Sequence, residues 1–185
     1  MSLWGNDIKP KNLTDAEKKE VFANTKGWVR EAGSILSGNG NTSADPEVLV
    51  AIGGLSANMG SANITELEFI TTAFDKSDGG TLQVRARFNE PVTVSGTPQL
   101  TVVNDSRANH TLSYASGSTT NELVFSLTIA AANAATNAGD ELSLGANAMS
   151  LNGGTIKDTG QSGTNATITN AASIGTAAGT ITVTA

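Results

Sequence analysis

The chain has 185 residues and a formal net charge of −6 at pH 7, which fits one ordinary domain and argues against nucleic-acid binding, because phosphate contacts require clustered Lys and Arg. It contains no cysteine, which excludes thiol catalysis, cysteine-ligated zinc and disulfides. Charged residues are only 15% and aromatic residues 4% of the chain, a composition that favours short strands with many turns and predicts a mainly β protein.

The first eleven residues, "MSLWGNDIKPK", predict an extended arm with an anchoring tryptophan. Trp4 stands among polar residues, Gly and Pro, so no neighbour in sequence can bury its indole ring. Because interface cores are enriched in Trp, we expect Trp4 and the Lys9-Pro10-Lys11 step to dock on a partner. Asp7 lies where a signal peptide would be apolar, and no apolar run approaches the roughly 20 residues of a spanning helix. We therefore expect neither a secretory leader nor membrane insertion.

The segment "LTDAEKKEVF" predicts a short helix. Thr14 and Glu17 have the spacing of a capping box, in which each side chain accepts from the other residue's backbone N–H. We expect Gly27 to end this helix. An isolated helix of about ten residues is marginal in water, so one side of it has to dock, and that side carries Ala16, Val21 and Phe22.

Two strands are expected next, over residues 27–34 ("GWVREAGS") and 46–54 ("PEVLVAIGG"), with Trp28 filling a small core. For the second segment a helix capped by Asp45, with Pro46 at its first position, is the alternative. Small and polar residues over 54–66 then predict a linker. We accordingly divide the chain into an N-terminal α+β region, residues 1–60, and a second domain, residues 61–185.

The second domain shows strand-like alternation between turn signals, and it carries ten acidic residues against five basic ones. In one segment Leu82, Val84, Ala86 and Phe88 share a face. Seven to eight short strands at this spacing predict an immunoglobulin-like β-sandwich. The uncharged "TITVT" near the C-terminus is either its last strand or a strand given to a partner. The other expected strands are 65–74, 80–88, 97–103, 110–115, 121–130, 140–145, 149–156 and 165–170.

Residues suited to catalysis are few. The single histidine, His110, has no partner motif and is expected to be exposed or to cap a strand. Asp75 and Asp78 in "DKSDGG" lack the further ligands of a calcium loop. We expect no enzymatic activity, no cofactor and no metal.

Two stretches resemble known families. The front, "LWGN", "KPKNLTDAEKKEVFANTKGWVREAG" and "NTSADPEVLVAIGG", resembles N-terminal segments of small virion structural proteins of contractile-tailed marine cyanophages. The back, "VRARFNEPVTVSGTPQLTV" and "LVFSLTIAAANAATNAGDELSLGANAMSLNGGTIKD", is similar to immunoglobulin-like modules of bacterial surface proteins and phage virions.

The resemblance implies a virion protein, made in the host cytoplasm, whose front region grips the particle while the sandwich is displayed outward. A head decoration protein is the favoured role, with the major capsid protein or other virion proteins as partners and further copies of the chain as an additional partner. An adhesin-like module that binds host glycans at the tail or baseplate is the alternative, with Tyr114 as its candidate platform. The expected partner interface comprises Trp4, Lys9, Pro10, Lys11, Phe22 and Trp28.

Overall fold

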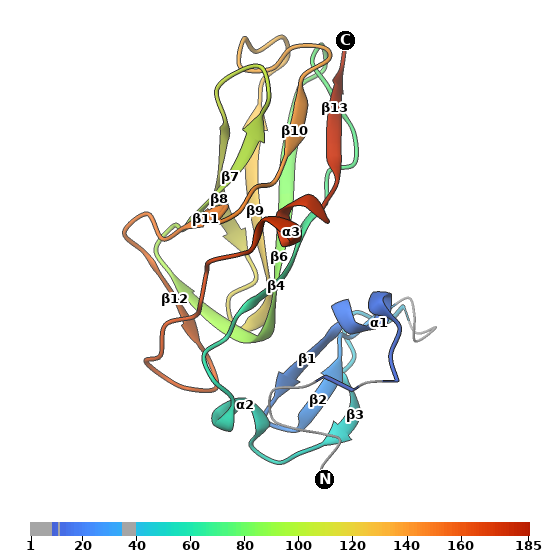
Figure 1. Cartoon of the computed structure of the whole chain (residues 1–185), viewed down its shortest axis with the longest axis vertical. Helices are drawn as coiled ribbons and strands as arrows, with labels where there is room; N and C mark the ends of the chain where they lie inside the picture. The colour runs from blue at the N-terminus through green and yellow to red at the C-terminus, as the bar shows by residue number, and fades with distance from the viewer. Residues whose placement is uncertain (1–8, 11, 35–39) are drawn as a thin grey trace.

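The computed structural model describes residues 9, 10, 12–34 and 40–185, and the chain is mainly β (Figure 1). A three-stranded sheet near the N-terminus and a ten-stranded, curled sheet share no strand. The larger sheet encloses one core in a β-sandwich-like arrangement. The elements are α1 (Asp15–Lys19), β1 (Val21–Asn24), β2 (Gly27–Arg30), β3 (Glu47–Ala51), α2 (Leu55–Asn58), β4 (Ile64–Phe69), β5 (Phe74–Asp75), β6 (Gly80–Ser95), β7 (Gln99–Asn104), β8 (His110–Ser116), β9 (Thr120–Ile129), β10 (Glu141–Ser143), β11 (Met149–Ser150), β12 (Thr155–Asp158), α3 (Ala172–Thr176) and β13 (Thr180–Thr184).

The expected N-terminal helix is shorter than predicted. The capping box of Thr14 and Glu17 is present, but α1 ends at Lys19 and buries no residue, so the expected docking of Ala16 is wrong. Val21–Asn24 instead pairs antiparallel with β2. Gly27 follows the tight turn between these strands and begins β2. Its φ is 135°, a conformation that a residue with a Cβ rarely adopts. Hairpin formation therefore overrides helix extension.

The strand prediction for residues 46–54 is confirmed, and its helical alternative is wrong. β3 pairs antiparallel with β2, with one register irregularity beside Trp28. The indole of Trp28 is 1% exposed and lies in a small cluster with Val21, Ala23, Leu55 and Met59, as expected for a core tryptophan. α2 thus covers one face of the small sheet. The predicted boundary near residue 60 falls between α2 and β4.

The alternation of Leu82, Val84, Ala86 and Phe88 is confirmed, since all four side chains are at most 1% exposed in the large core. β6 is longer than expected and continues beyond Pro91 to Ser95. Its pairing with β9 shifts register between residues 87 and 92, where a proline without a backbone N–H is accommodated.

The C-terminal strand β13 lies between β10 and β5, so it belongs to the sandwich of its own chain. The expected strand over 165–170 is reduced to isolated bridges at Asn165 and Thr167. Nearby, the short helix α3 was not predicted, because its sequence "ASIGT" has no charged first turn or capping side chain. The immunoglobulin-like identity of the sandwich stays a prediction.

Candidate functional site

The four described residues of the expected partner interface are packed within the chain. Phe22 is 7% exposed on β1, Trp28 lies in the small core, and Pro10 is buried. The ammonium group of Lys9 donates to the carbonyl oxygen of Lys18 at 2.6 Å. These residues therefore do not form one exposed surface. Trp4 and Lys11 lie outside the described residues, and their role stays a prediction.

A set of ion pairs joins the small sheet to the sandwich, and we call it the junction network: Lys19, Glu31, Glu66, Arg87 and Glu122. The Arg87 guanidinium lies 2.6 Å from the carboxylates of both Glu66 and Glu122, and 3.4 Å from that of Glu31. Lys19 contacts Glu66 at 2.6 Å. Lys19 and Glu31 flank the small sheet, whereas the other three residues belong to β4, β6 and β9. The network therefore crosses from one part of the molecule to the other.

The sandwich half of this network is a cross-strand ladder. Glu66 on β4 stands opposite Arg87 on β6, and Arg87 stands opposite Glu122 on β9. Opposite charges at directly paired positions attract each other across a sheet. Two residues further along, on the same face, Arg85 pairs with Glu68 at 2.6 Å. The sequence signal for this ladder is Glu at alternate positions of β4 and Arg at alternate positions of β6.

Burial perturbs the charges at the junction. It raises the pKa of Glu31 to about 7, with the neighbouring Glu122 carboxylate adding to the effect and Arg87 opposing it. Burial also lowers the pKa of Lys9 to about 8, against the attraction of Glu31 and Glu66. For Glu66, burial is outweighed by hydrogen bonds from Lys19 and Arg87, so its pKa is lowered. Within the junction network, Glu31 is therefore a carboxyl whose pKa is raised, whereas that of Glu66 is lowered.

A cavity of about 540 Å³ lies beside the junction network, between the small sheet and the sandwich. Phe22, Pro46 and Pro91 give it apolar walls, while Asn24 and Asn121 add amide groups. The Asn121 amide already donates to Glu31 at 2.9 Å. The Asn121 amide and the Glu31 carboxylate are therefore engaged with each other within the chain.

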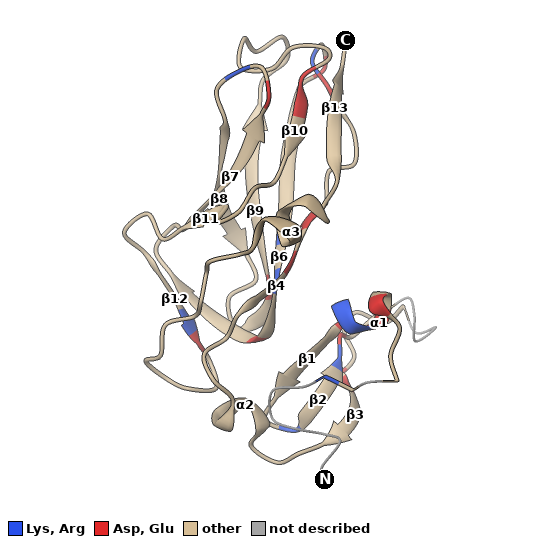
Figure 2. Cartoon of the chain, viewed as in Figure 1, with Lys and Arg blue, Asp and Glu red and all other residues tan. Residues whose placement is uncertain are grey.

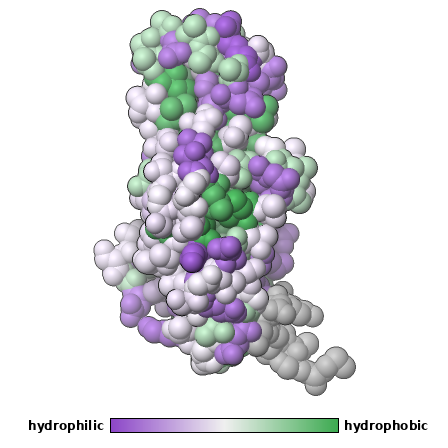
Figure 3. All heavy atoms as spheres, turned by 90° about the vertical axis from the view of Figure 1, so that its left-hand side faces the viewer, coloured by the Kyte–Doolittle hydropathy of each residue, from purple (hydrophilic) through white to green (hydrophobic). Residues whose placement is uncertain are grey.

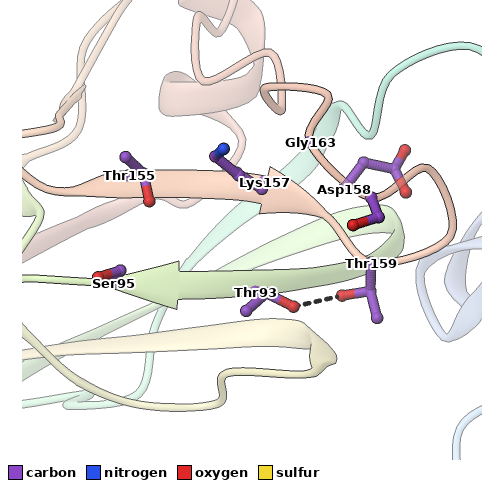
Figure 4. Close-up of a pocket in the computed structure, with 8 residues that line it drawn as sticks. Thr93, Ser95, Thr155, Lys157, Asp158, Thr159 and Gly163 are labelled. Carbon is purple, nitrogen blue, oxygen red and sulfur yellow. Dashed lines mark hydrogen bonds between the residues drawn. The ribbon is translucent and has the colours of Figure 1, made fainter.

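A second hollow, a groove of about 430 Å³, lies on the β6–β12 ribbon (Figure 4). Thr93 and Ser95 of β6 stand opposite Lys157 and Thr155 of β12. The hydroxyl oxygens of Thr93 and Thr159 are 2.9 Å apart. The groove is therefore lined mainly by hydroxyl groups, together with the charged residues Lys157 and Asp158, a lining suited to a hydroxylated ligand.

His110 is 4% exposed at the first position of β8, so the expectation of an exposed histidine is wrong. Burial lowers its pKa, against the attraction of Asp140. The Asp140 carboxylate accepts from the Asn104 side-chain amide at 2.9 Å. Within the described part of the chain, no three His, Asp or Glu residues gather in a way that could hold a metal ion. No helix among these residues is long and apolar enough to span a membrane.

Figure 2 shows charged residues at the junction and at the far end of the sandwich, with few along the middle. The face in Figure 3 is mainly pale or purple, with smaller green areas. Across residues 9–10, 12–34 and 40–185, the large hydrophobic side chains exposed by more than a third are Val48, Ile70 and Leu151. They lie on three separate elements or loops, so they define no single apolar patch.

Comparison with known proteins assigns the chain to no family, because no protein-family model, curated protein or solved structure matches it.

Proposed function

We propose that the chain is a non-enzymatic virion structural protein, a head decoration protein that docks through its N-terminal region and displays an immunoglobulin-like sandwich outward. Its partner in this proposal is the major capsid protein or another virion protein. The resemblance of the front sequence to cyanophage virion proteins supports this context. The proposal assigns no catalytic activity to the chain.

The observation that carries the proposal is the junction network. Because Arg87 bridges carboxylates from both parts of the molecule, the small sheet and the sandwich are tied at one end. The end of α2 adds to this attachment, since the side-chain amide of Gln161 donates to the carbonyl oxygen of Met59. A partner that binds the N-terminal region therefore also orients the sandwich, as a displayed domain requires.

Rebinding to particles stripped of this protein tests the proposal. The informative truncation removes residues 1–8, because a longer one would also remove the half-buried Lys9 and the buried Pro10. We expect full-length protein to rebind heads at saturable occupancy and the truncated protein to fail, although both give the same thermal unfolding curve. Asp105→Asn, at the end of the sandwich away from the N-terminal region, is the control, and this variant should rebind heads like wild type. Equal rebinding of the truncated protein contradicts anchoring through this arm.

The hydroxyl-lined groove favours one second candidate, an adhesin-like module that binds host glycans. Tyr114 supports it less, since its hydroxyl accepts from the backbone N–H of Ser118 at 2.9 Å and its ring packs edge-on against Phe125. Binding of full-length protein to host cells but not to heads, reduced by Lys157→Ala, would replace the decoration proposal with this one.

A further inference from the structure

The cavity beside the junction network has the size and the position of a ligand site. Its volume of about 540 Å³ lies within the range of about 300–1,000 Å³ that is usual for small-molecule pockets. One side is formed by β1 and the segment after β2, and the other by Pro91 and the start of β9. Pockets often form where two parts of a protein meet. The cavity therefore exists only when the small sheet is packed on the sandwich.

The charges on the walls of this cavity have one sign. Among the described residues that line it, the charged ones are Glu31 and Glu122, and both are acids. The neighbouring cations Lys9, Lys19 and Arg87 also belong to the described residues, but they do not line the cavity. An anion in the cavity would therefore meet like charge, whereas a cation would meet charge of the opposite sign.

The two carboxyl groups share one donor atom of Arg87. Its Nε lies 2.6 Å from Glu122 and 3.4 Å from Glu31. This nitrogen carries a single hydrogen, which it donates to Glu122. Glu31 instead accepts from the side-chain amide of Asn121 at 2.9 Å. The hydrogen-bond donor that the structure describes for Glu31 is thus a neutral amide and not a cation.

The cations near Glu31 do not fully offset its surroundings. Burial raises the pKa of Glu31 to about 7, and Glu122 adds to this through its charge and through a hydrogen bond that a protonated carboxyl donates. Arg87 acts in the opposite direction, and Lys9 is also attracted to Glu31. Because the pKa stays raised in spite of both cations, a further positive charge in the cavity would stabilise the ionised form of Glu31.

We propose that this cavity binds a planar organic cation, an amidinium or guanidinium group on an apolar body, with the cation against Glu31 and Glu122. Such a group presents two parallel N–H donors that match the two oxygens of a carboxylate. A guanidinium is also less strongly hydrated than an ammonium group, so it loses less hydration energy in a partly apolar cavity. Phe22, Pro46 and Pro91 supply apolar contacts for the body of the ligand.

The same chemistry occurs in two sources, the arginine side chain of a partner protein and a free small-molecule amidine or guanidine. The site does not rest on the proposed function, because the cavity is formed within one chain. If the chain docks on a particle, an arginine of the particle surface is one occupant that the cavity would accept, since buried interface anchors are enriched in arginine.

Protonation of Glu31 competes with a bound cation, so binding should strengthen as pH rises towards and past about 7. The charged groups around Glu31 are Lys9 before α1, Lys19 and Glu20 at the end of α1, Glu66 on β4, Arg87 on β6 and Glu122 on β9. The pKa of Lys9 is lowered to about 8, and measurements up to pH 7.5 keep its titration small. Between pH 6 and pH 7.5 we expect the affinity to rise about five- to tenfold.

Titration of the full chain with benzamidine, followed in proton–nitrogen correlation NMR spectra, tests the site. At pH 7.5 we expect a dissociation constant of about 1 mM, with shifts at the side-chain amides of Asn24 and Asn121, which line the cavity. Benzamide, a neutral compound of the same shape, should bind about tenfold more weakly or worse. Equal binding of the two compounds, or shifts confined to other parts of the chain, refutes the proposal.

Glu31→Gln removes the charge but keeps an oxygen that accepts from Asn121. This variant should bind benzamidine about fivefold more weakly or worse at pH 7.5 and should lose most of the pH dependence. Glu141→Gln is the control, because Glu141 is an exposed acid on β10, away from the junction (Figure 1), and it should bind like wild type. If Glu31→Gln keeps both the affinity and the pH dependence of wild type, the proposal fails. The comparison of benzamidine with benzamide uses wild-type protein, so it does not depend on how the variant folds.

A blocked arginine, N-acetylarginine methylamide, distinguishes the two sources of the cation. Binding at least as tight as that of benzamidine supports an arginine side chain from a partner protein, whereas binding of benzamidine alone supports a free small molecule. Binding of neither compound refutes a cation site in this cavity. These titrations involve no particles, so the cation site and the proposed function can fail separately.

Discussion

Replacement of Arg87 by methionine should destabilise the attachment of the small sheet to the sandwich. The change removes the guanidinium group that contacts Glu66 and Glu122 at 2.6 Å each and leaves their carboxylates in a largely buried setting. Breaking a buried ion pair typically costs about 3–5 kcal/mol. Lys19 still contacts Glu66, and Arg85 remains 3.5 Å from Glu122. We therefore expect a loss at the lower end of that range, about 3 kcal/mol.

Chemical denaturation at pH 7.5, followed by two signals, measures this effect. Both tryptophans lie in residues 1–60, so Trp fluorescence reports on the N-terminal region, while far-UV circular dichroism reports mainly on the sandwich strands. In wild type we expect the two transitions to coincide. In Arg87→Met the fluorescence transition should move to lower denaturant than the circular dichroism transition, because Glu31 is no longer bridged to the sandwich by Arg87.

Two further variants separate the junction network from general effects of charge. Arg87→Lys keeps the charge but loses the planar fork that contacts several carboxylates, so an intermediate loss is expected. Lys18→Ala removes the exposed pair with Asp15, whose side chain is 97% exposed, and should change the unfolding free energy by less than about 1 kcal/mol. If Arg87→Met costs less than about 1 kcal/mol, the bridging role assigned to Arg87 is refuted.

Two other predictions follow from the same structure. The raised pKa of Glu31 means that the folded state binds its proton more tightly than the unfolded state, so this contribution to stability is lost as pH rises from about 4.5 through about 7. The unfolding free energy of Glu31→Gln relative to wild type should therefore be higher at pH 8 than at pH 5, by about 2 kcal/mol; a difference that does not change with pH contradicts the reasoning. The difference between variant and wild type is used because His110 also contributes to the pH dependence of stability. Its pKa is lowered in the folded state, so this residue favours folding as pH rises. Separately, Gly27→Ala should cost more than about 3 kcal/mol, since a Cβ there would lie 2.0 Å from the Val50 carbonyl oxygen. Gly139→Ala, at φ 89° with open space around it, should cost only about 1–2 kcal/mol, and equal melting temperatures for the two variants would show that the close contact is unimportant.

Local patterns predicted the parts of the fold that depend on neighbours in sequence. The capping box at Thr14 and the alternation that begins at Leu82 both appear as expected. The helix over Val21 and Phe22 failed because helical propensity was weighed without the partner strand, and the pairing of β1 with β2 outweighs it. The extension of β6 beyond Pro91 was missed for a similar reason, since a register shift that admits proline is set by β9.

The junction network was beyond local reasoning because its members come from distant positions. Glu31, Glu66, Arg87 and Glu122 meet only once two sheets have formed and packed together. Only the ladder between β4 and β6 leaves a local trace, as Arg and Glu at alternate positions. Contact between Glu31 and Arg87 depends on the path of the chain between β3 and β4, which no periodicity encodes.

The burial of Lys9, Phe22 and Trp28 changes how the anchoring hypothesis has to be framed. These side chains were selected because large apolar and cationic groups often form interface cores, but the same groups also fill cores and junctions within a chain. Lys9 has its ammonium group on the Lys18 carbonyl, and its pKa is lowered to about 8 by burial, so it is not a free surface cation. Substituting Lys9, Phe22 or Trp28 would disturb the fold before it disturbed a partner. The anchoring hypothesis therefore rests on Trp4 and Lys11, and substitution of these two residues in the full chain separates docking from folding.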